Sequence, residues 1–231
     1  MDIRKKLTQK NYSIIAKLYT EDLERNYENF NFIDDVLQLW KLHKLQIYPI
    51  VDLGSGPGTV IDYILKQHKK IHPLIAVDFN EYFCDRMNRK YIHSKNINVV
   101  HEEMVQFVKR QKALAIGAYI CSYSLIHIPE NEIDQLLQSI KRSLVKNGLL
   151  LISCFKGTTK GMEQERYQVL KDSRLVYNET LLCYMNYFTE DELRKRLKKA
   201  GMEIVKMEVV SKGKKDVDIP NEQIWVIAEK L

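Results

Sequence analysis

Cysteine is scarce in this sequence, and the few cysteines stand far apart. The chain of 231 residues has four, Cys84, Cys121, Cys154 and Cys183, and no two of them have C-x-x-C spacing. This scatter argues against a zinc cluster and against a disulfide framework, and it is typical of proteins from a reducing cytoplasm. No other cluster of metal-ligating residues is apparent, so we predict a protein that works without a metal ion.

Long hydrophobic runs are also missing. No apolar run reaches the roughly 20 residues that a membrane-spanning helix needs. The first residues, MDIRKKLTQKNYS, carry charges without an apolar segment behind them, which is unlike a secretory signal peptide. We therefore expect a cytoplasmic protein without a membrane anchor.

Internal repeats and low-complexity segments are absent as well, and the composition is that of a folded protein. Hydrophobic residues make up 45% of the chain and charged residues 29%, which excludes wholesale disorder and collagen-like or coiled-coil chains. A chain of this length can bury a core of its own. We expect one domain that spans residues 1–231.

The excess of positive charge is small and is divided among short clusters. The chain has 36 basic and 30 acidic residues, which gives a net charge of +6. One cluster, residues 194–199, follows the acidic residues Glu190, Asp191 and Glu192, an order that complements the dipole of a helix. We therefore interpret it as an exposed helix end in preference to a patch that binds RNA.

From residue 47 onward, short apolar segments alternate with segments that have helical periodicity. The expected strands are residues 47–53, 73–78, 98–101, 113–121 and 149–155, and the expected helices are 59–70, 81–94, 104–110 and 131–146. The last helix should end at Asn147 and Gly148, a pair typical of a left-handed C-cap. Strands that are apolar throughout indicate a parallel sheet covered on both faces. The sequence therefore predicts a doubly wound, Rossmann-like α/β fold.

The two ends of the chain depart from this alternation. Residues 1–46 are predicted as a helical cover, residues 47–156 as the core, and residues 157–188 as an irregular, tyrosine-rich insertion that acts as a lid. In the last part, 189–231, a helix over 189–200 precedes two strands, 202–210 and 223–229, which form a hairpin because no helix separates them. The expected sheet is mostly parallel, has seven strands and ends in an antiparallel pair.

A glycine-rich turn follows the first expected strand, in the sequence Val51-Asp52-Leu53-Gly54-Ser55-Gly56-Pro57-Gly58-Thr59. Glycines allow positive φ and a close approach of a ligand, and the helix that follows offers free amides to a polar ligand. Two details separate the motif from the dinucleotide pattern G-x-G-x-x-G. The third glycine comes two residues after the second, and Asp52, whose carboxylate can hold an ammonium group, stands at the end of the strand.

An acidic residue also ends the second expected strand. Asp78 lies in Ala76-Val77-Asp78-Phe79-Asn80, close to the ~20-residue distance at which a ribose-binding acid is expected. Its carboxylate can accept hydrogen bonds from both ribose hydroxyls. The alternative is that Asp78 or Asn80 caps the helix that follows.

Together these motifs resemble the class I S-adenosylmethionine-dependent methyltransferases, and the resemblance extends over nearly the whole chain. It includes Tyr12 and Tyr19, the glycine turn and Asp78. It continues through Glu102-Glu103-Met104, Ser124-Leu125-Ile126-His127-Ile128-Pro129 and residues 144–153, and it ends with residues 188–193 and 200–203. The chain looks most like the subgroup that acts on small molecules, which has an N-terminal helical cover and an insertion after the fifth strand.

The resemblance implies S-adenosylmethionine as the cofactor and S-adenosylhomocysteine as its product. The residues implied in cofactor binding are Tyr19, Asp52, Gly54, Ser55, Gly56, Asp78, Phe79, Glu103, Met104, Cys121 and Ser122. Within this set, Asp78 would take the ribose hydroxyls, and Glu103 with Met104 would meet the adenine edge. Glu103 departs from the family pattern, which commonly has aspartate there.

His127 is the candidate catalytic base, because in this fold it follows the fourth strand beside the reactive end of the cofactor. The alternative is a packed histidine bonded to the backbone. Tyr12, Tyr123, Tyr184 and Tyr187 are the candidates for contact with the acceptor. We expect at least one of Tyr184 and Tyr187, which belong to the insertion, to face the cofactor pocket.

The predicted function is methyl transfer to an oxygen or nitrogen atom of a small molecule by in-line displacement, where alignment is worth ~7–11 kcal/mol. Three alternatives stay open: methylation of tRNA or another nucleic acid, binding of the cofactor without turnover, and an NAD-dependent dehydrogenase. The dispersed positive charge disfavours the first, and the glycine spacing with the terminal hairpin disfavours the third. The sequence does not distinguish binding without turnover from catalysis, since the glycines and Asp78 would bind the cofactor in either case.

Overall fold

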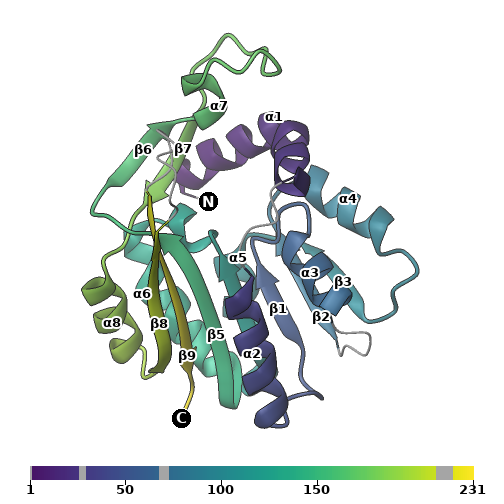
Figure 1. The fold of residues 1–231 in the computed structure, drawn as a ribbon, viewed down its shortest axis with the longest axis vertical. Coiled ribbons are helices and arrows are strands. Elements are labelled where there is room, and N and C mark those ends of the chain that lie inside the picture. The colour runs from purple at the N-terminus through teal and green to yellow at the C-terminus, as the bar shows by residue number, and fades with distance from the viewer. Residues whose placement is uncertain (1, 26–29, 68–72, 212–220) are drawn as a thin grey trace.

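A seven-stranded sheet forms the centre of the computed structural model, which describes residues 2–25, 30–67, 73–211 and 221–231. The strand order is β3-β2-β1-β4-β5-β9-β8 (Figure 1). The strands are β1 (Ile50–Leu53), β2 (Leu74–Asp78), β3 (Ile97–His101), β4 (Ile116–Ser122), β5 (Leu144–Phe155), β8 (Glu203–Ser211) and β9 (Glu222–Glu229). Strands β1 to β5 pair in parallel, whereas β9 is antiparallel to β5 and β8. The predicted doubly wound, mostly parallel sheet with a C-terminal antiparallel hairpin is confirmed.

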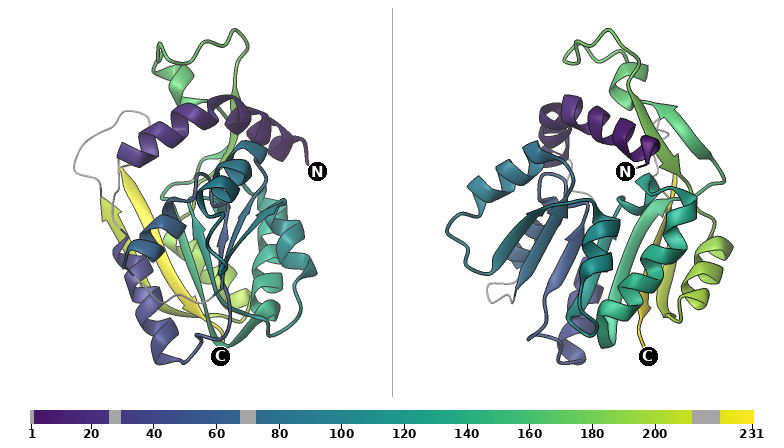
Figure 2. Two further views of the ribbon diagram at one scale, coloured as in Figure 1. Left: turned by 90° about the vertical axis from the view of Figure 1, so that its right-hand side faces the viewer. Right: turned by 180° about the vertical axis from the view of Figure 1, so that it is seen from behind.

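Helices cover both faces of this sheet (Figure 2). On one face lie α2 (Asn31–Leu42), α3 (Thr59–Gln67) and α4 (Glu81–Lys90), and on the other lie α5 (Met104–Arg110), α6 (Glu130–Ser143) and α8 (Glu190–Lys199). The reason is visible in α6, where Ile133, Leu136, Leu137 and Ile140 form one apolar stripe that is buried against the sheet. One hydrophobic cluster on each face therefore holds the layers together.

Helix α1 (Ile3–Arg25) lies apart from these layers and crosses above the carboxyl ends of the strands (Figure 1). Toward the core, Gln9 Nε2 donates to the carbonyl oxygen of Phe79 at 2.7 Å. Toward the insertion, the amide of Tyr184 donates to Thr8 Oγ1 at 2.9 Å. The residues predicted as one helical cover, 1–46, are thus two elements with different places. Only α1 lies over the strand ends, because the apolar stripe of α2 is buried on a face of the sheet.

The insertion after β5 contains a second, two-stranded sheet. Its elements are β6 (Lys160–Gln164), α7 (Arg166–Val169) and β7 (Leu182–Asn186), and β6 pairs with β7 in antiparallel register. The prediction of an irregular segment over residues 157–188 is wrong for these elements. The sequence of β6, KGMEQ, lacks apolar alternation, so the strand owes its form to pairing with β7, which periodicity does not reveal.

The end of α6 also differs from the prediction. The helix stops at Ser143, and β5 begins at once with Leu144. Asn147 has the expected left-handed φ of 59°, but its amide donates to the carbonyl oxygen of Lys230 at 2.8 Å from within β5. The pairing of β5 with β4 shifts at this point, so Asn147 serves an irregularity of the strand instead of a helix cap.

One other predicted helix ends earlier than expected. Helix α4 stops at Lys90, before the predicted residue 94. Its C-cap is Tyr91, whose hydroxyl donates to Gly58 O at 3.1 Å and Asp62 Oδ1 at 2.9 Å, contacts that tie this end to the turn after β1. Helix α3 is described as far as Gln67, and the rest of the predicted helix 59–70 lies outside the described residues.

Gly58 is a position in the glycine turn where a side chain should be costly. Its φ of +91° favours glycine, and a Cβ would come within 2.7 Å of the Tyr91 hydroxyl. We expect Gly58→Ala to lower the free energy of unfolding by about 1–3 kcal/mol in urea denaturation, because backbone strain adds to this contact. The same substitution in the Tyr91→Phe background should cost less, since the crowded oxygen is gone. An equal cost in both backgrounds would contradict a role for the contact.

Candidate active site

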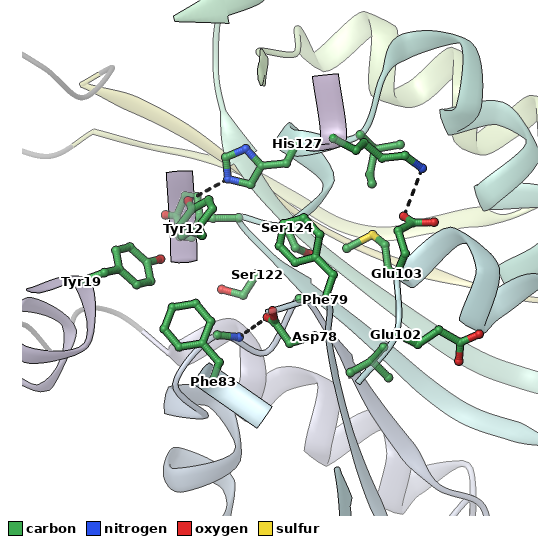
Figure 3. A pocket seen from close by; sticks show the side chains of 17 residues that line it. Tyr12, Tyr19, Asp78, Phe79, Phe83, Glu102, Glu103, Ser122, Ser124 and His127 are labelled. Carbon is green, nitrogen blue, oxygen red and sulfur yellow. Dashed lines mark hydrogen bonds and ion pairs between the residues drawn. The ribbon is translucent and has the colours of Figure 1, made fainter. Parts of the chain in front are cut away.

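A cavity with about 80 Å³ of free volume lies at the carboxyl edge of the sheet, on the side covered by α1 (Figure 3). Its lining comes from α1, from the segments after β1, β2 and β3, and from the segment after β4, which includes the short helix η1 (Leu125–His127). Of the candidate site residues, the structure places Tyr12, Tyr19, Gly54, Gly56, Asp78, Phe79, Glu103, Met104, Ser122, Tyr123 and His127 on this lining.

The glycine turn forms one wall of the cavity. Gly54 and Gly56 have φ of +72° and +53°, which glycine adopts without strain. The amides of Gly54 and Ser55 donate to the carbonyl oxygen of Val77 at 2.8 and 3.0 Å and hold the turn against β2. A Cβ on Gly56 would lie 3.9 Å from Tyr19 Cε1. The missing side chain therefore keeps the space between the turn and α1 open for a ligand.

Asp78 connects this turn to the start of α4. Its Oδ2 accepts a hydrogen bond from the Gly56 amide at 2.7 Å, and its Oδ1 accepts one from the Asn80 amide at 2.8 Å. Asn80 is the N-cap of α4, and its own side chain accepts from the Phe83 amide. The cap is therefore Asn80, and Asp78 keeps lone pairs for a ligand, since a carboxylate has about four acceptor sites. Burial raises the pKa of Asp78 to about 6.

Three residues implied in cofactor binding do not line the cavity, and all three are buried: Asp52, Ser55 and Cys121. Cys121 packs in a hydrophobic cluster, and burial raises the pKa of its thiol to about 12. Asp52 Oδ2 has no hydrogen-bond partner among the described residues, and burial raises the pKa of Asp52 to about 7. A cationic group close to this carboxylate would stabilise its charged form.

Lys5 is a lining residue that the sequence analysis missed. Its Nζ lies 2.6 Å from Glu132 Oε2 and 3.3 Å from Glu103 Oε1, and only 6% of its side chain is exposed. Glu103 is at the same time the N-cap of α5, where it accepts from two backbone amides. The spacing of Lys5, Tyr12 and Tyr19 is seven residues, which places them on one face of a helix, and this pattern was the signal that could have found Lys5.

Ser124, Phe83 and Glu102 also line the cavity without having been predicted. Ser124 Oγ is buried and has no hydrogen-bond partner among the described residues. A Cβ on Gly54 would lie 2.5 Å from the Ser124 Cβ, so the turn after β1 and the segment after β4 approach each other closely here. An unpartnered hydroxyl on a cavity wall suits a polar ligand.

His127 stands in η1 with both ring nitrogens engaged. Nδ1 lies 2.9 Å from the carbonyl oxygen of Tyr184, and Nε2 lies 2.9 Å from the hydroxyl of Tyr12 (Figure 3). A carbonyl only accepts, so Nδ1 carries the hydrogen, and Nε2 accepts from the Tyr12 hydroxyl. Burial lowers the pKa of His127 to about 4, although the bond to Tyr184 opposes this shift. The imidazole is therefore neutral at pH 7, and its lone pair faces Tyr12.

Aromatic side chains surround this histidine on the α1 side. The rings of Tyr12 and Tyr19 meet edge to face at 5.4 Å, and the Tyr12 ring lies 5.3 Å from the imidazole of His127. Phe83 lies 6.0 Å from Tyr19. Burial raises the pKa of both tyrosines, so their hydroxyls remain protonated donors at neutral pH.

The candidate acceptor residues Tyr123, Tyr184 and Tyr187 have three different places. Tyr123 lines the cavity, has a left-handed φ of 52° and donates its hydroxyl hydrogen to Gln223. The side chains of Tyr184 and Tyr187 do not line it. Tyr184 packs its ring under the Arg4 guanidinium at 5.2 Å and contributes only its carbonyl, to His127. Tyr187 donates to Glu163 Oε2 at 3.1 Å, because the end of β7 directs its ring toward β6.

Comparison with known proteins agrees with the fold described above. Residues 50–148 match a family model described as a methyltransferase domain, and no curated protein matches the chain. A solved S-adenosylmethionine-dependent methyltransferase from Clostridium acetobutylicum is 13% identical with a TM-score of 0.64, over 94% of this chain and 98% of that one.

Two further solved structures have a similar fold. The 1,6-didemethyltoxoflavin-N1-methyltransferase of Burkholderia thailandensis, which was solved with 1,6-didemethyltoxoflavin and S-adenosylhomocysteine, is 15% identical with a TM-score of 0.60, over 96% of this chain and 90% of that one. The [4+2]-cyclase SpnF is 14% identical with a TM-score of 0.64, over 98% and 96%. At these identities the similarity concerns the fold alone, which the cyclase shares with the methyltransferases.

Residues 50–148 therefore match a methyltransferase domain, and the strand order of the chain is that of the fold found in these S-adenosylmethionine-dependent methyltransferases. None of the helices in the described part of the chain combines the length and apolar character that crossing a membrane requires.

The environment of His127 predicts its titration. Besides the Tyr184 carbonyl, the groups that face the ring are the Tyr12 hydroxyl of α1 and the Cys183 thiol of β7, 3.4 Å from Nδ1. Because burial lowers its pKa to about 4, we expect the NMR signals of His127 to stay those of the neutral Nδ1–H form from pH 8 to pH 5.5. The exposed His93 provides the comparison signal.

The same pKa shift has a consequence for stability. The unfolded chain takes up this proton near the ordinary histidine pKa of ~6.5, before the folded protein does, so the free energy of unfolding should decrease as the pH falls from about 6.5 toward 4. A His127 signal that moves to the charged form near pH 6.5 would contradict this description of the site.

Proposed function

We propose that this methyltransferase transfers the methyl group of S-adenosylmethionine to an oxygen or nitrogen atom of a small molecule, with His127 as the base. The observation that carries the proposal is a cavity enclosed by α1 and by the segment after β4. A neutral histidine and a tyrosine hydroxyl meet on its lining. A base that is neutral at pH 7 can accept a proton, and such a group typically contributes about 10²–10⁴-fold to a rate.

The residues of the cavity fit the cofactor. Asp78 has free lone pairs for the ribose hydroxyls, Gly54 and Gly56 leave room for a close approach, and Phe79 and Met104 offer apolar surface to the adenine. Asp52 is not part of this lining, and its buried Oδ2 has no partner in the described structure. When bound, the cofactor supplies an electrophilic methyl group and a neutral thioether as leaving group.

The chain itself contributes alignment and protection from water. Helix α1 crosses the cavity and is held by Gln9 on the side of the core and by Thr8 on the side of the insertion. Tyr12 and Tyr19 line the cavity from this helix, and His127 lines it from η1. Reactants enclosed in this way are held in one orientation, which is the main source of rate in a displacement that needs little bond chemistry from the protein.

A small acceptor is favoured over a nucleic acid by the state of the basic residues. Two basic residues of the cluster on α8 are paired with acids: Arg196 contacts Asp134 Oδ1 at 2.6 Å, and Lys199 contacts Asp134 Oδ2 at 2.6 Å. These side chains are not free for phosphates, on which nucleic-acid affinity depends. The similarity in fold to an enzyme named for 1,6-didemethyltoxoflavin, a small molecule, supports the same choice.

The proposal is tested with the purified full chain. Calorimetric titration should show binding of both S-adenosylmethionine and S-adenosylhomocysteine. Tritiated S-adenosylmethionine should then label a low-molecular-weight extract and leave total tRNA unlabelled. Labelling of tRNA that weakens steeply with salt would favour the nucleic-acid alternative, and cofactor binding without label in any fraction would favour a protein that binds without turnover.

Asp78 and Asn80 are neighbours whose roles the structure separates. Asp78→Asn should weaken S-adenosylmethionine about tenfold or more, because bonds to a charged acceptor contribute about 1.5–3 kcal/mol each. Asn80→Ala should leave the affinity nearly unchanged and lower the free energy of unfolding by about 1 kcal/mol, since it removes the cap of α4. Calorimetry and urea denaturation measure both quantities. Normal affinity in Asp78→Asn would contradict the ribose assignment.

A further inference from the structure

The basic nitrogen of His127 is hydrogen-bonded to Tyr12 on the cavity lining. The lone pair of His127 Nε2 is already occupied by the Tyr12 hydroxyl at 2.9 Å, and Nδ1 is held by the Tyr184 carbonyl. Both His127 and Tyr12 line the cavity. A molecule in the cavity therefore reaches the basic nitrogen only through the phenol oxygen, unless the pair separates.

The Tyr12 oxygen is able to receive a proton in this arrangement. A hydroxyl has one hydrogen and two acceptor lone pairs. Its hydrogen points to His127, so the lone pairs remain for an O–H or N–H group of a ligand. Tyr12 also cannot act as a permanent phenolate, because burial raises its pKa well above the ordinary value. It can only take one proton while it gives up another.

The charges around the cavity discriminate against anions. Of the described lining residues, Lys5 is the one with a fixed positive charge, and Glu132 and Glu103 already neutralise it at 2.6 and 3.3 Å. Asp78 adds a carboxylate to the same lining, whereas Glu102 is paired with Arg110 at 2.6 Å. A carboxylate or phosphate in the cavity would lose its hydration without gaining a cation, which is costly.

Resting on the proposed function, we propose that the acceptor is an uncharged molecule with an O–H or ring N–H group. Tyr12 receives the proton of this group while it passes its own proton to His127. The bond between the acceptor atom and hydrogen breaks, and the proton forms a new bond to Tyr12 Oη. The original O–H bond of Tyr12 breaks, and that proton forms a bond to His127 Nε2. The electron pair left on the acceptor atom forms the bond to the methyl carbon, while the pair of the broken carbon–sulfur bond stays on sulfur.

This sequence agrees with the weak basicity of His127. Methylation of a neutral oxygen or ring nitrogen that keeps its proton gives a strongly acidic cation, so even a base whose pKa burial lowers to about 4 can accept the proton as the bond forms. An acceptor that is already an anion needs no base. The Tyr12–His127 pair would then have no chemical task, and the neutralised Lys5 would give no attraction.

The substrate class is tested with matched probes on the protein saturated with S-adenosylhomocysteine. Phenol and benzimidazole represent uncharged O–H and ring N–H groups, and benzoate and phenyl phosphate represent anions of similar size. We expect the neutral probes to bind about tenfold or more tightly than the anions in calorimetry, because an unpaired charge next to like charges is unfavourable. Equal or tighter binding of the anions, or no binding of either neutral probe, overturns the proposal.

The proton path is tested with variants on whichever neutral probe is methylated fastest. Tyr12→Phe keeps the ring and removes the hydroxyl, and His127→Gln removes the base. Each should lower kcat by about 10²-fold or more and leave the affinity for S-adenosylmethionine within a few-fold. The double variant should be no slower than the slower single variant, since both act in one path. Tyr48→Phe and His93→Gln, outside the cavity lining, are the matched controls.

A solvent isotope effect on kcat completes the test, because a purely structural role of Tyr12 would not change it. In mixtures of H₂O and D₂O, kcat of the unmodified enzyme should depend on the deuterium fraction as expected for two protons in motion, and Tyr12→Phe should lose this dependence. Full activity in Tyr12→Phe, or multiplying losses in the double variant, overturns the path while cofactor binding and methyl transfer stand. Failure of the unmodified chain to bind S-adenosylmethionine would instead overturn the proposed function.

Discussion

The position of α1 across the carboxyl edge of the sheet is the constraint on which the site depends. The helix bridges two parts of the chain, through Gln9 to the Phe79 carbonyl and through Thr8 to the Tyr184 amide. Only with α1 in this place do Tyr12 and His127 come within 2.9 Å. The core alone presents the glycine turn and Asp78. The cavity, its closure and the Tyr12–His127 bond all need the helix.

Much of the fold and the cofactor side of the cavity could be predicted from sequence because both are local. The turn at Gly54 and Gly56 and the carboxylate of Asp78 follow strands whose apolar pattern is plain, and parallel strands bring their ends to one edge. The remaining features could not be predicted, because they depend on contacts between residues far apart in the sequence. Strand β6 forms because it pairs with β7. The ion pair of Lys5 with Glu132 joins residues far apart in the sequence, which no short sequence pattern connects.

Burial shifts the pKa values of the titratable groups of the site in opposite directions for the histidine and the aspartates. It lowers the pKa of His127 to about 4 and raises those of Asp52 and Asp78 to about 7 and about 6, so each shift is toward the neutral form. A cationic ligand would oppose this shift in the two aspartates. His127 stays neutral while its own neighbours are a phenol, a thiol and a carbonyl. The cavity thus separates a region that attracts positive charge from a region that keeps a free base.

The fold by itself does not decide the reaction, since a [4+2]-cyclase shares it at a TM-score of 0.64. In this chain, α1 and the insertion complete the cavity that the core of the sheet begins. They supply Tyr12, Lys5 and the Tyr184 carbonyl, and this carbonyl determines which nitrogen of His127 carries the hydrogen. A strand outside the cavity thereby orients the imidazole of His127 within it. On the proposed function, acceptor chemistry depends on how these two additions meet, whereas cofactor binding belongs to the core.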